Sequence, residues 1–424
     1  MKVLVVGQGG REHALVRALK QSPSVAEVHA LPGSDGIAQD ATCHAQDWRD
    51  FAAMTGFCQR ERFDLVVIGP ENPLVDGLAD ALRAGGVAVF GPSREAAKLE
   101  GSKIFCKEFL LEAGVPTARS IVVNSVDSVR MAAGEFLPPY VLKADGLAAG
   151  KGVYICKTLR ELEDAARDLF DDKVLGSAGE RALLEEFKPG YEISYLILTD
   201  GESFEPLPLA QDHKRLFDRD EGPNTGGMGV VAPMVMDHEL RERLDREVIQ
   251  PTLRLLRKRA SEGRGFLFRG VLFVGLMMTD EGPSVLEFNT RFGDPETQAI
   301  LPLFDGDWGV VFREAAMGRL PKMSWKNLNS CCVVLAAAGY PDAPVKGLVI
   351  EGVREAVERE SYLLHAGTKR QNNDWVTNGG RVLNAVGLGT SLSEAVERAY
   401  KLALSIHCQG MQVRRDIGAK ALDA

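Results

Sequence analysis

Short apolar runs alternate with amphipathic segments over the first hundred residues. Residues 3–6, 26–31, 64–68 and 87–90 are β-rich apolar runs, and residues 11–21 have the periodicity of a helix. Strands that alternate with helices predict a parallel sheet covered by helices on both faces. We therefore expect residues 1–102 to form a doubly wound α/β domain, with ligands at the carboxyl ends of its strands.

The middle of the chain, residues 103–322, has a pattern that favours antiparallel strands. Two candidate strands, 140–144 and 152–156, flank a glycine-rich loop, and further strands are expected at 183–187 and 192–199. Residues 238–258 have the pattern of an amphipathic helix. The sequence Asp280-Glu281-Gly282-Pro283 predicts a hairpin turn between apolar strands within 266–289.

The last part, residues 323–424, changes character again. Apolar runs at 333–337 and 382–386 are followed by a helical pattern over 391–408. These features predict a small α/β domain, and the whole chain is therefore expected to combine α/β and α+β parts in three domains.

Composition limits the classes of protein that fit. The 424 residues carry a formal charge of −9, which gives no general footprint for nucleic acid or an anionic membrane. Seven scattered cysteines without a C-x-x-C spacing indicate a reducing compartment. Met1 leads directly into a predicted strand, and no apolar run is long enough to span a bilayer. We expect a cytoplasmic monomer that acts on small molecules.

Residues 287–296 hold the most informative motif, Glu-Phe-Asn-Thr-Arg-Phe-Gly-Asp-Pro-Glu. Strand alternation places Glu287, Asn289 and Arg291 on one face. A carboxylate beside an amide oxygen suits Mg²⁺ that keeps positions for phosphate oxygens, and an arginine can clamp a carboxylate or phosphate. An ion-paired strand end without chemistry is the alternative. Because of its anionic role, Arg291→Ala is expected to lower the rate far more than the stability.

Residues 143–153 form a second candidate, a small-residue loop between two strands. Its backbone amides can approach phosphate oxygens, and Lys143 and Lys151 add positive charge at its ends. It is not a Walker A loop, because Gly152 follows Lys151 where a serine or threonine is required. An ordinary glycine hairpin is the alternative.

Two further segments have the composition of anion sites. Residues 7–13 follow the first strand and open a helix, where a phosphate monoester suits the amides of Gly9 and Gly10 and the side chain of Arg11. Glu12 stands at the third glycine position of a dinucleotide motif, which argues against NAD. Residues 222–229 form a turn-rich glycine loop after the charged segment 211–215, and a flexible surface loop is the alternative.

Taken together, these segments resemble the glycinamide ribonucleotide synthetases (phosphoribosylamine–glycine ligases), ATP-grasp enzymes of purine biosynthesis. The resemblance extends over essentially the whole chain, through residues 7–13, 69–71, 99–103, 143–152, 211–215, 222–229, 287–296, 365–368, 378–381 and 416–418. It implies an ATP-grasp fold and a reaction of glycine, 5-phosphoribosylamine and ATP through a glycyl phosphate. No enzyme nucleophile is required, so catalysis would depend on positioning and charge neutralisation.

The resemblance also implies roles for individual residues. The residues implied for ATP are Lys103, Lys143, Gly150, Lys151, Gly152, Glu185, Glu186, Phe187 and Glu192. The ligands implied for Mg²⁺ or Mn²⁺ are Glu287 and Asn289, because residues 271–279 contain no acid. The residues implied for glycine and the phosphoribosyl group are Arg291, Gly293, Asp294, Asp212, Lys214, Gly9, Gly10, Arg11, Glu71, Asn224, Thr225, Gly226, Gly227 and Met228. Residues 123–189 would form a closing lid.

Three alternatives have sequence features that separate them from this interpretation. A carboxylating or biotin-dependent ATP-grasp ligase fits residues 9–13 and 226–229 less well. A nucleotide-binding regulatory protein is expected to have lost some of Lys143, Lys151, Glu287, Asn289 and Arg291, yet all are present. A dinucleotide-binding oxidoreductase is expected to have a third glycine and an acid at the end of the second strand, and this chain has neither.

Overall fold

Five parallel strands form the N-terminal sheet, in the order β3-β2-β1-β4-β5. The computed structural model describes residues 1–148, 152–353 and 360–422. The strands are β1 (Lys2–Gly7), β2 (Glu27–Pro32), β3 (Thr42–Cys43), β4 (Leu65–Ile68) and β5 (Val89–Phe90), and the helices between them are α1 (Gly10–Lys20), α2 (Phe51–Glu61), α3 (Glu71–Asp76) and α4 (Leu78–Ala84). The predicted alternation of strands and helices is confirmed.

Strand β1 is apolar along its length because helices cover both of its faces. Val3 and Val5 pack in one core with residues of α1 and of α12 (Trp308–Ala316). Leu4 and Val6 pack in a second core with residues of α2 and α4. All four side chains are at most 1% exposed, which explains why the strand reads as a continuous hydrophobic run.

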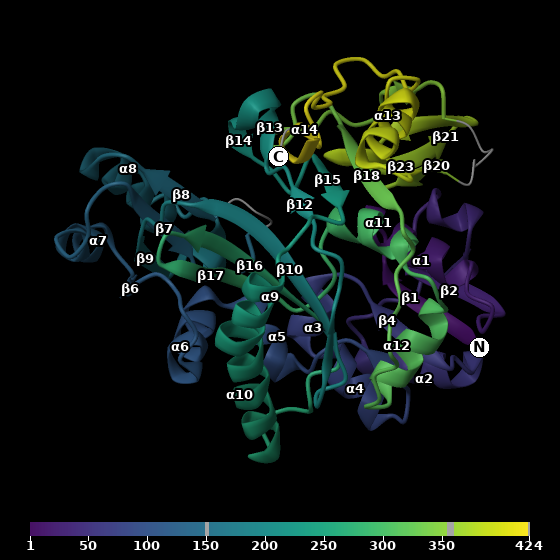
Figure 1. The fold of residues 1–424 in the computed structure, drawn as a ribbon, viewed down its shortest axis with the longest axis horizontal. Helices are drawn as coiled ribbons and strands as arrows, with labels where there is room; N and C mark the ends of the chain where they lie inside the picture. Colours follow the sequence, from purple (N-terminus) through teal and green to yellow (C-terminus); the bar gives the residue numbers. More distant parts are fainter. Residues whose placement is uncertain (149–151, 354–359, 423–424) are drawn as a thin grey trace.

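The middle of the chain folds into two antiparallel sheets, as predicted. The first is named the lid sheet after the lid predicted for residues 123–189, and it has the order β6-β9-β7-β8. The second, the central sheet, has the order β11-β10-β16-β17. Their strands are β6 (Ser120–Val123), β7 (Tyr140–Ala144), β8 (Val153–Cys156), β9 (Ala182–Glu186), β10 (Tyr191–Thr199), β11 (Phe204–Pro206), β16 (Gly270–Thr279) and β17 (Gly282–Asn289). Figure 1 shows the lid sheet at one end of the molecule's long axis.

Helices cover these two sheets. Helices α7 (Val126–Ala133) and α8 (Leu159–Phe170) pack in one core with the lid sheet. Helices α5 (Arg94–Gly101) and α6 (Lys103–Ala113) pack with the central sheet. The predicted helix over 238–258 is confirmed as α9 (His238–Leu244), a π-helical turn at Asp245–Ile249, and α10 (Gln250–Ser261).

A fourth sheet joins the middle of the chain to its last part. This C-terminal sheet has the order β12-β15-β18-β23-β20. Its strands are β12 (Gln211–Asp212), β15 (Gly229–Ala232), β18 (Asn329–Ala336), β20 (Ser361–His365) and β23 (Arg381–Gly389). A small sheet, β19-β22-β21, lies beside it and consists of β19 (Val349–Ile350), β21 (Thr368–Gln371) and β22 (Asp374–Thr377). The division at residues 102 and 322 stays a prediction.

Two expected segments differ in the structure. Residues 222–229 were expected as one loop, but β14 (Glu221–Asn224) pairs with β13 (Arg215–Phe217) in a hairpin. The helix expected over 391–408 is α13 (Leu392–Ala403), which ends five residues early. Short helices α11 (Glu296–Ile300) and α14 (Ala419–Leu422) are the remaining α-helices of the described residues.

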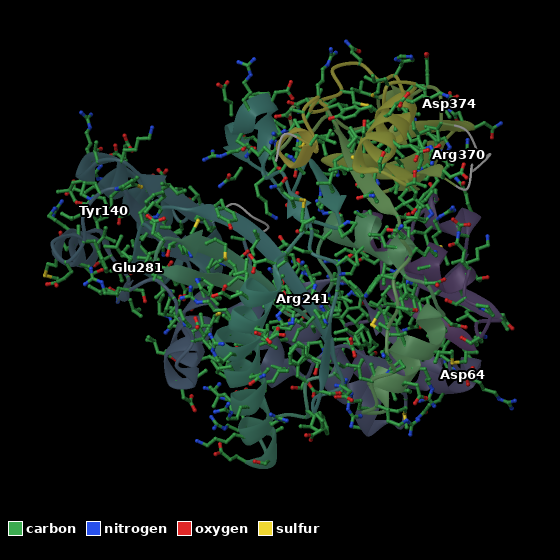
Figure 2. The ribbon with its side chains drawn as sticks, in the orientation of Figure 1. Asp64, Tyr140, Arg241, Glu281, Arg370 and Asp374 are labelled. Carbon is green, nitrogen blue, oxygen red and sulfur yellow. The ribbon has the colours of Figure 1, made fainter. Side chains whose placement is uncertain are left out.

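Side chains that end in nitrogen or oxygen extend outward along the edge of the molecule (Figure 2). No helix within the described part of the chain is long and apolar enough to cross a membrane.

Candidate active site

The carboxyl end of β17 carries the two predicted metal ligands. Glu287 lies opposite Gly275 and Asn289 opposite Phe273 on β16, and the side chain between them, Phe288, is buried. Strand alternation therefore directs Glu287 and Asn289 to the same face. Lys103 Nζ donates to Glu287 Oε2 at 2.9 Å. The charge of Lys103 lowers the pKa of the Glu287 carboxyl to about 2, so this group is a carboxylate at neutral pH.

Lys103 is the first residue of α6. Asp145, which follows β7, fixes the start of that helix. Asp145 Oδ1 accepts from the Ser102 hydroxyl at 2.7 Å and from the Ile104 amide at 2.9 Å. The Lys103 amide donates to the Asp145 carbonyl at 3.0 Å. Asp145 follows β7, so it couples the lid sheet to the helix that carries Lys103. Asp145 is not among the residues predicted for the site.

Lys143 lies on β7 and shares a buried carboxylate with a second lysine. Its Nζ is 2.7 Å from Glu185 Oε2, while Lys107 Nζ is 3.0 Å from Glu185 Oε1. Burial raises the pKa of Glu185, but the two lysines outweigh this effect and lower it. The three groups carry one net positive charge, and Lys143 Nζ also donates to the Leu286 carbonyl of β17 at 3.3 Å.

Three further predicted nucleotide residues, Glu186, Phe187 and Glu192, lie around the connection from β9 to β10. Glu186 pairs with Lys188 at 3.2 Å, and its Oε1 accepts from the Arg119 amide. Phe187 is partly exposed, and burial raises the pKa of Glu192 on β10. Gly152 directly precedes β8, and its carbonyl accepts from the Ala144 amide at the end of β7. Gly150 and Lys151 lie outside the described residues.

Arg291 lies beyond the strand rather than on it, because β17 ends at Asn289. Its Nη2 is 2.8 Å from Glu100 Oε1 and 3.4 Å from Asn289 Oδ1, and its Nε is 3.4 Å from Glu71 Oε2. Glu100 also accepts from the Thr290 amide at 2.8 Å. Burial raises the pKa of Glu100. Glu100 belongs to the motif at residues 99–103, yet its contact with Arg291 joins residues far apart in sequence.

The predicted phosphate loop is held by its own side chains. The Gly9 amide donates to Glu12 Oε2 at 2.7 Å, and Arg11 Nε donates to Glu12 Oε1 at 2.6 Å. Arg11 also donates to the Phe292 carbonyl at 3.2 Å. Gly9 and Arg11 thus donate within the protein in this structure, and their role toward a phosphate monoester stays a prediction. The first-turn amides of α1, beginning with Gly10, are donors that the helix itself does not use.

The segment Thr225–Met228 is anchored at every residue. Thr225 donates through its amide and its hydroxyl to the Lys214 carbonyl, each at 2.8 Å, and the Met228 amide donates to the His213 carbonyl at 2.8 Å. Gly227 has φ +110°, and a Cβ there would lie 2.5 Å from Pro295 Cδ. Asn224, at the end of β14, pairs with Arg215.

Asp212 and Lys214 form an ion pair beside this segment. Lys214 Nζ is 2.5 Å from Asp212 Oδ2 and 3.9 Å from Glu296 Oε1. Burial lowers the pKa of Lys214, but Asp212 and Glu296 outweigh it and raise the pKa, so the lysine stays charged. Gly293 packs against Glu296, because a Cβ there would lie 2.3 Å from Glu296 Oε2.

Asp294 is held from two sides. Gln298 Nε2 donates to its Oδ1 at 2.7 Å, and Arg381 Nη2 is 3.0 Å from its Oδ2. Burial raises the pKa of Asp294, but Arg381 and Arg11 outweigh this effect and lower it. Arg381 was noted only as part of the motif at 378–381, and its approach to Asp294 depends on a contact across 87 residues.

The donor set at the end of β17 fits Mg²⁺ or Mn²⁺. Within the described residues, no group of three or more His, Cys, Asp or Glu side chains is arranged around a metal position. Glu287 and Asn289 supply one carboxylate and one amide oxygen. Two protein ligands of this type are sufficient for an ion that takes its other ligands from phosphate groups and water.

The paired antiparallel sheets, with lysines on both sides of a strand end, define a protein of the ATP-grasp class. The biotin carboxylase domain of a 2-oxoglutarate carboxylase from Hydrogenobacter thermophilus shares this fold, with a TM-score of 0.74 at 18% identity over 97% of this chain and 91% of that one. Residues 1–100, 101–297 and 330–420 match the N domain, the ATP-grasp domain and the C domain of phosphoribosylglycinamide synthetase. The chain belongs to the phosphoribosylglycinamide synthetase family.

Relatives that match over their whole length support this membership. The chain is 44% identical to the phosphoribosylamine–glycine ligase of Vibrio cholerae and 45% identical to that of Mesorhizobium japonicum, over 100% of this chain and 99% of each relative. The crystal structure of the Thermotoga maritima phosphoribosylamine–glycine ligase superposes with a TM-score of 0.85 at 36% identity, over 98% of this chain and 100% of that one.

Proposed function

We propose that the chain joins glycine to 5-phosphoribosylamine in purine biosynthesis, with ATP as the source of free energy. A glycine carboxylate oxygen attacks the γ-phosphorus, ADP leaves, and glycyl phosphate forms. The amine of phosphoribosylamine then attacks the acyl carbon, phosphate leaves, and the nitrogen loses a proton. The products are glycinamide ribonucleotide, ADP and phosphate.

The nucleotide is proposed to lie between the lid sheet and the central sheet. Lys103 and Lys143 neutralise the charge of the phosphates, and the backbone at Glu185, Glu186 and Phe187 faces the adenine. Glu192 is placed to accept from ribose hydroxyls, and Gly150, Lys151 and Gly152 cover the phosphates. Mg²⁺, or Mn²⁺ in its place, would be held by Glu287 and Asn289 and would withdraw charge from the phosphate oxygens.

The acceptor is proposed to lie between α1 and the segment Thr225–Met228. Arg291 orients the glycine carboxylate, while the amides that begin at Gly10 face the 5-phosphate of the second substrate. Lys214 supplies a permanent positive charge, and Asp212 keeps it in place. Glu71, Gly293, Asp294 and Asn224 shape the space in which the amine meets the acyl group.

One observation carries this proposal. The strand end with Glu287 and Asn289 is followed directly by Arg291 and Asp294, so the metal side and the acceptor side share one continuous segment. A phosphoryl group beside a metal ion held by Glu287 would be a neighbour of a carboxylate held at Arg291. This proximity is the main requirement of a reaction that needs no enzyme nucleophile.

The free thiols suit a reducing compartment, and we extend the proposal to a cytoplasmic location. All seven cysteines are unpaired, and five of them are buried. Thiols of this kind persist where the glutathione pool is reduced. A monomer that binds glycine and phosphoribosylamine is the proposed working form.

The proposed reaction is tested by ADP release with Mg²⁺-ATP, glycine and freshly generated phosphoribosylamine, each omitted in turn. ADP formation that requires both glycine and phosphoribosylamine is expected for coupled turnover. Hydroxylamine in place of the amine should give glycine hydroxamate, because it attacks an acyl phosphate at the same carbon. ADP release that depends on bicarbonate instead of glycine would move the substrate and contradict the proposal.

A further inference from the structure

Arg381 connects the C-terminal sheet to two parts of the acceptor side. It is the first residue of β23, and its Nη1 donates to the Gly226 carbonyl at 2.6 Å and to the Asp294 carbonyl at 2.7 Å. Its Nη2 is 3.0 Å from Asp294 Oδ2. One guanidinium therefore fixes the backbone of two segments and the side chain of one.

The approach of Gly226 to this guanidinium is close. A Cβ at Gly226 would lie 3.2 Å from Arg381 Cζ, so the segment Thr225–Met228 packs directly against the guanidinium group. The Gly226 amide donates to the Tyr340 hydroxyl oxygen at 2.9 Å, which holds the other side of the same peptide segment. Both partners belong to the last hundred residues, whereas Gly226 lies in the middle of the chain.

The charge of Arg381 is matched to Asp294. Asp294 accepts from Gln298 at one oxygen and faces Arg381 at the other, so both of its oxygens are occupied. The Arg381 side chain is 20% exposed, and water screens the pair only partly. A planar guanidinium can serve all three acceptors at once, while a lysine ammonium is a compact charge without this fork.

We propose that Arg381 is a positioning residue of the acceptor side. It sets the separation between Asp294 and Gly226, and through them the width of the space that receives the phosphoribosyl group. This inference rests on the proposed function, because it assigns that space to the second substrate. A role limited to joining two parts of the fold would change stability without changing one substrate more than another.

The test compares Arg381→Lys and Arg381→Gln with matched variants of Arg398. Arg398 lies on α13, donates to the Leu388 carbonyl and pairs with Glu394, so it makes the same kinds of contact away from the site. We measure the KM for phosphoribosylamine, the Kd for a non-hydrolysable ATP analogue, the ratio of ADP to glycinamide ribonucleotide, and the melting temperature of each full-length variant.

Both Arg381 variants are expected to lower kcat/KM for phosphoribosylamine about 100-fold, the effect of a displacement of roughly 1 Å at a reacting centre. ADP should exceed glycinamide ribonucleotide, because glycyl phosphate is then hydrolysed before the amine captures it. The Kd for the ATP analogue should stay unchanged, and the Arg398 variants should match the unmodified protein. If Arg381→Gln does not fold, Arg381→Lys still tests the positioning role, because it keeps the charge but loses the fork of the guanidinium.

Two results would overturn the assignment. One is a fall in kcat that accounts for the whole fall in kcat/KM, with an unchanged KM for phosphoribosylamine and an unchanged product ratio. The other is wild-type behaviour of Arg381→Lys. A failure of the proposed function looks different, because the unmodified protein itself would then form no glycine hydroxamate with hydroxylamine.

Discussion

Arg291 is bound by two carboxylates, and this contact changes what its removal is expected to do. Glu100 is 5% exposed at its side chain and Glu71 is 29% exposed, and both face the same guanidinium. Removal of one partner from a buried ion pair costs about 3 kcal/mol or more. Arg291→Ala is therefore expected to lower the stability as well as the rate, since Glu100 would lose its ion-pair partner.

A charge-conserving substitution separates the two effects. Arg291→Lys keeps a cation beside Glu100 but loses the fork that can hold a carboxylate with two parallel hydrogen bonds. We expect kcat to fall about 100-fold, the loss typical of one lost transition-state donor. The melting temperature should change little. Steady-state kinetics and thermal unfolding check this, with Arg398→Lys as the control, and near-normal turnover would contradict the role of Arg291.

Residue types that carry charge or metal ligands could be selected from the sequence, but their partners could not. Glu287, Asn289, Lys103 and Lys143 stand in motifs whose composition already indicates phosphate chemistry. Glu100 and Arg381 stand in motifs too, and nothing local distinguishes them from surface charges. Their contacts reach across 191 and 87 residues respectively, counted from Glu100 to Arg291 and from Asp294 to Arg381.

Among the elements, α6 depends on a residue outside it. Asp145 binds Ser102 and Ile104 at the start of the helix, and Arg181 Nη2 lies 2.9 Å from its second oxygen. The position of Lys103 is thus set partly by the lid sheet.

Asp145→Ala is expected to weaken both the helix start and the nucleotide site. The stability should fall by about 1 to 2 kcal/mol, as for the loss of a helix cap. The Kd for an ATP analogue should rise, because Lys103 is no longer fixed. Asp50→Ala is the matched control, since Asp50 caps α2 through the Ala53 amide away from this site. Equal nucleotide affinity of the two variants, measured by calorimetry, would contradict the coupling.

Elements with a strong local pattern were predicted well, and elements formed by pairing were not. The strands of the N-terminal sheet are apolar on both faces, so their sequences alone identify them. The strand Glu221–Asn224 has the sequence Glu-Gly-Pro-Asn, which has no strand pattern. It forms because β13 lies beside it.

At the scale of the whole molecule, residues 414–416 hold the hairpin of β13 and β14 in place. Arg414, fully buried, donates to Asp416 Oδ2 at 2.7 Å, to Asp220 Oδ1 at 2.9 Å and to the Arg215 carbonyl at 3.1 Å. Asp416 also accepts from the Arg219 amide at 2.8 Å. The hairpin β13–β14, which leads into the segment Thr225–Met228, is therefore held by residues near the carboxyl terminus.

The contacts of the Asp416 carboxylate predict that the protein loses stability at acidic pH. Burial raises the pKa of Asp416, but hydrogen bonds from Arg414 and the Arg219 amide outweigh it and lower the pKa to about 2. A carboxyl whose folded pKa lies below its unfolded value of 3.8 stabilises the fold above pH 3.8, and this contribution is lost as pH falls through about 2.

Asp416→Asn should accordingly lower the free energy of unfolding by about 1 to 2 kcal/mol at pH 6. The difference from the unmodified protein should shrink as pH falls from 4 toward 2. Urea unfolding at a series of pH values checks this. A difference that stays constant down to the lowest accessible pH would show that charge on Asp416 is not the cause.

The topology of the C-terminal sheet lay beyond the reach of the sequence pattern. Strand β15 pairs with β18 across about a hundred residues, with Val231 opposite Cys331. Local periodicity predicts that each strand exists, but it carries no information on which strands become neighbours.

Arg381 lies in the part of the chain that matches the C domain, whereas its partner Asp294 lies in the part that matches the ATP-grasp domain. During synthesis, Lys103, Lys143 and Glu287 are therefore made before Arg381. A product that terminated prematurely between residues 300 and 380 would carry the proposed phosphate-binding side chains but leave Asp294 without its arginine. Such a fragment would also lack β23, the strand between β18 and β20, so the acceptor side and the sheet that supports it would be lost together.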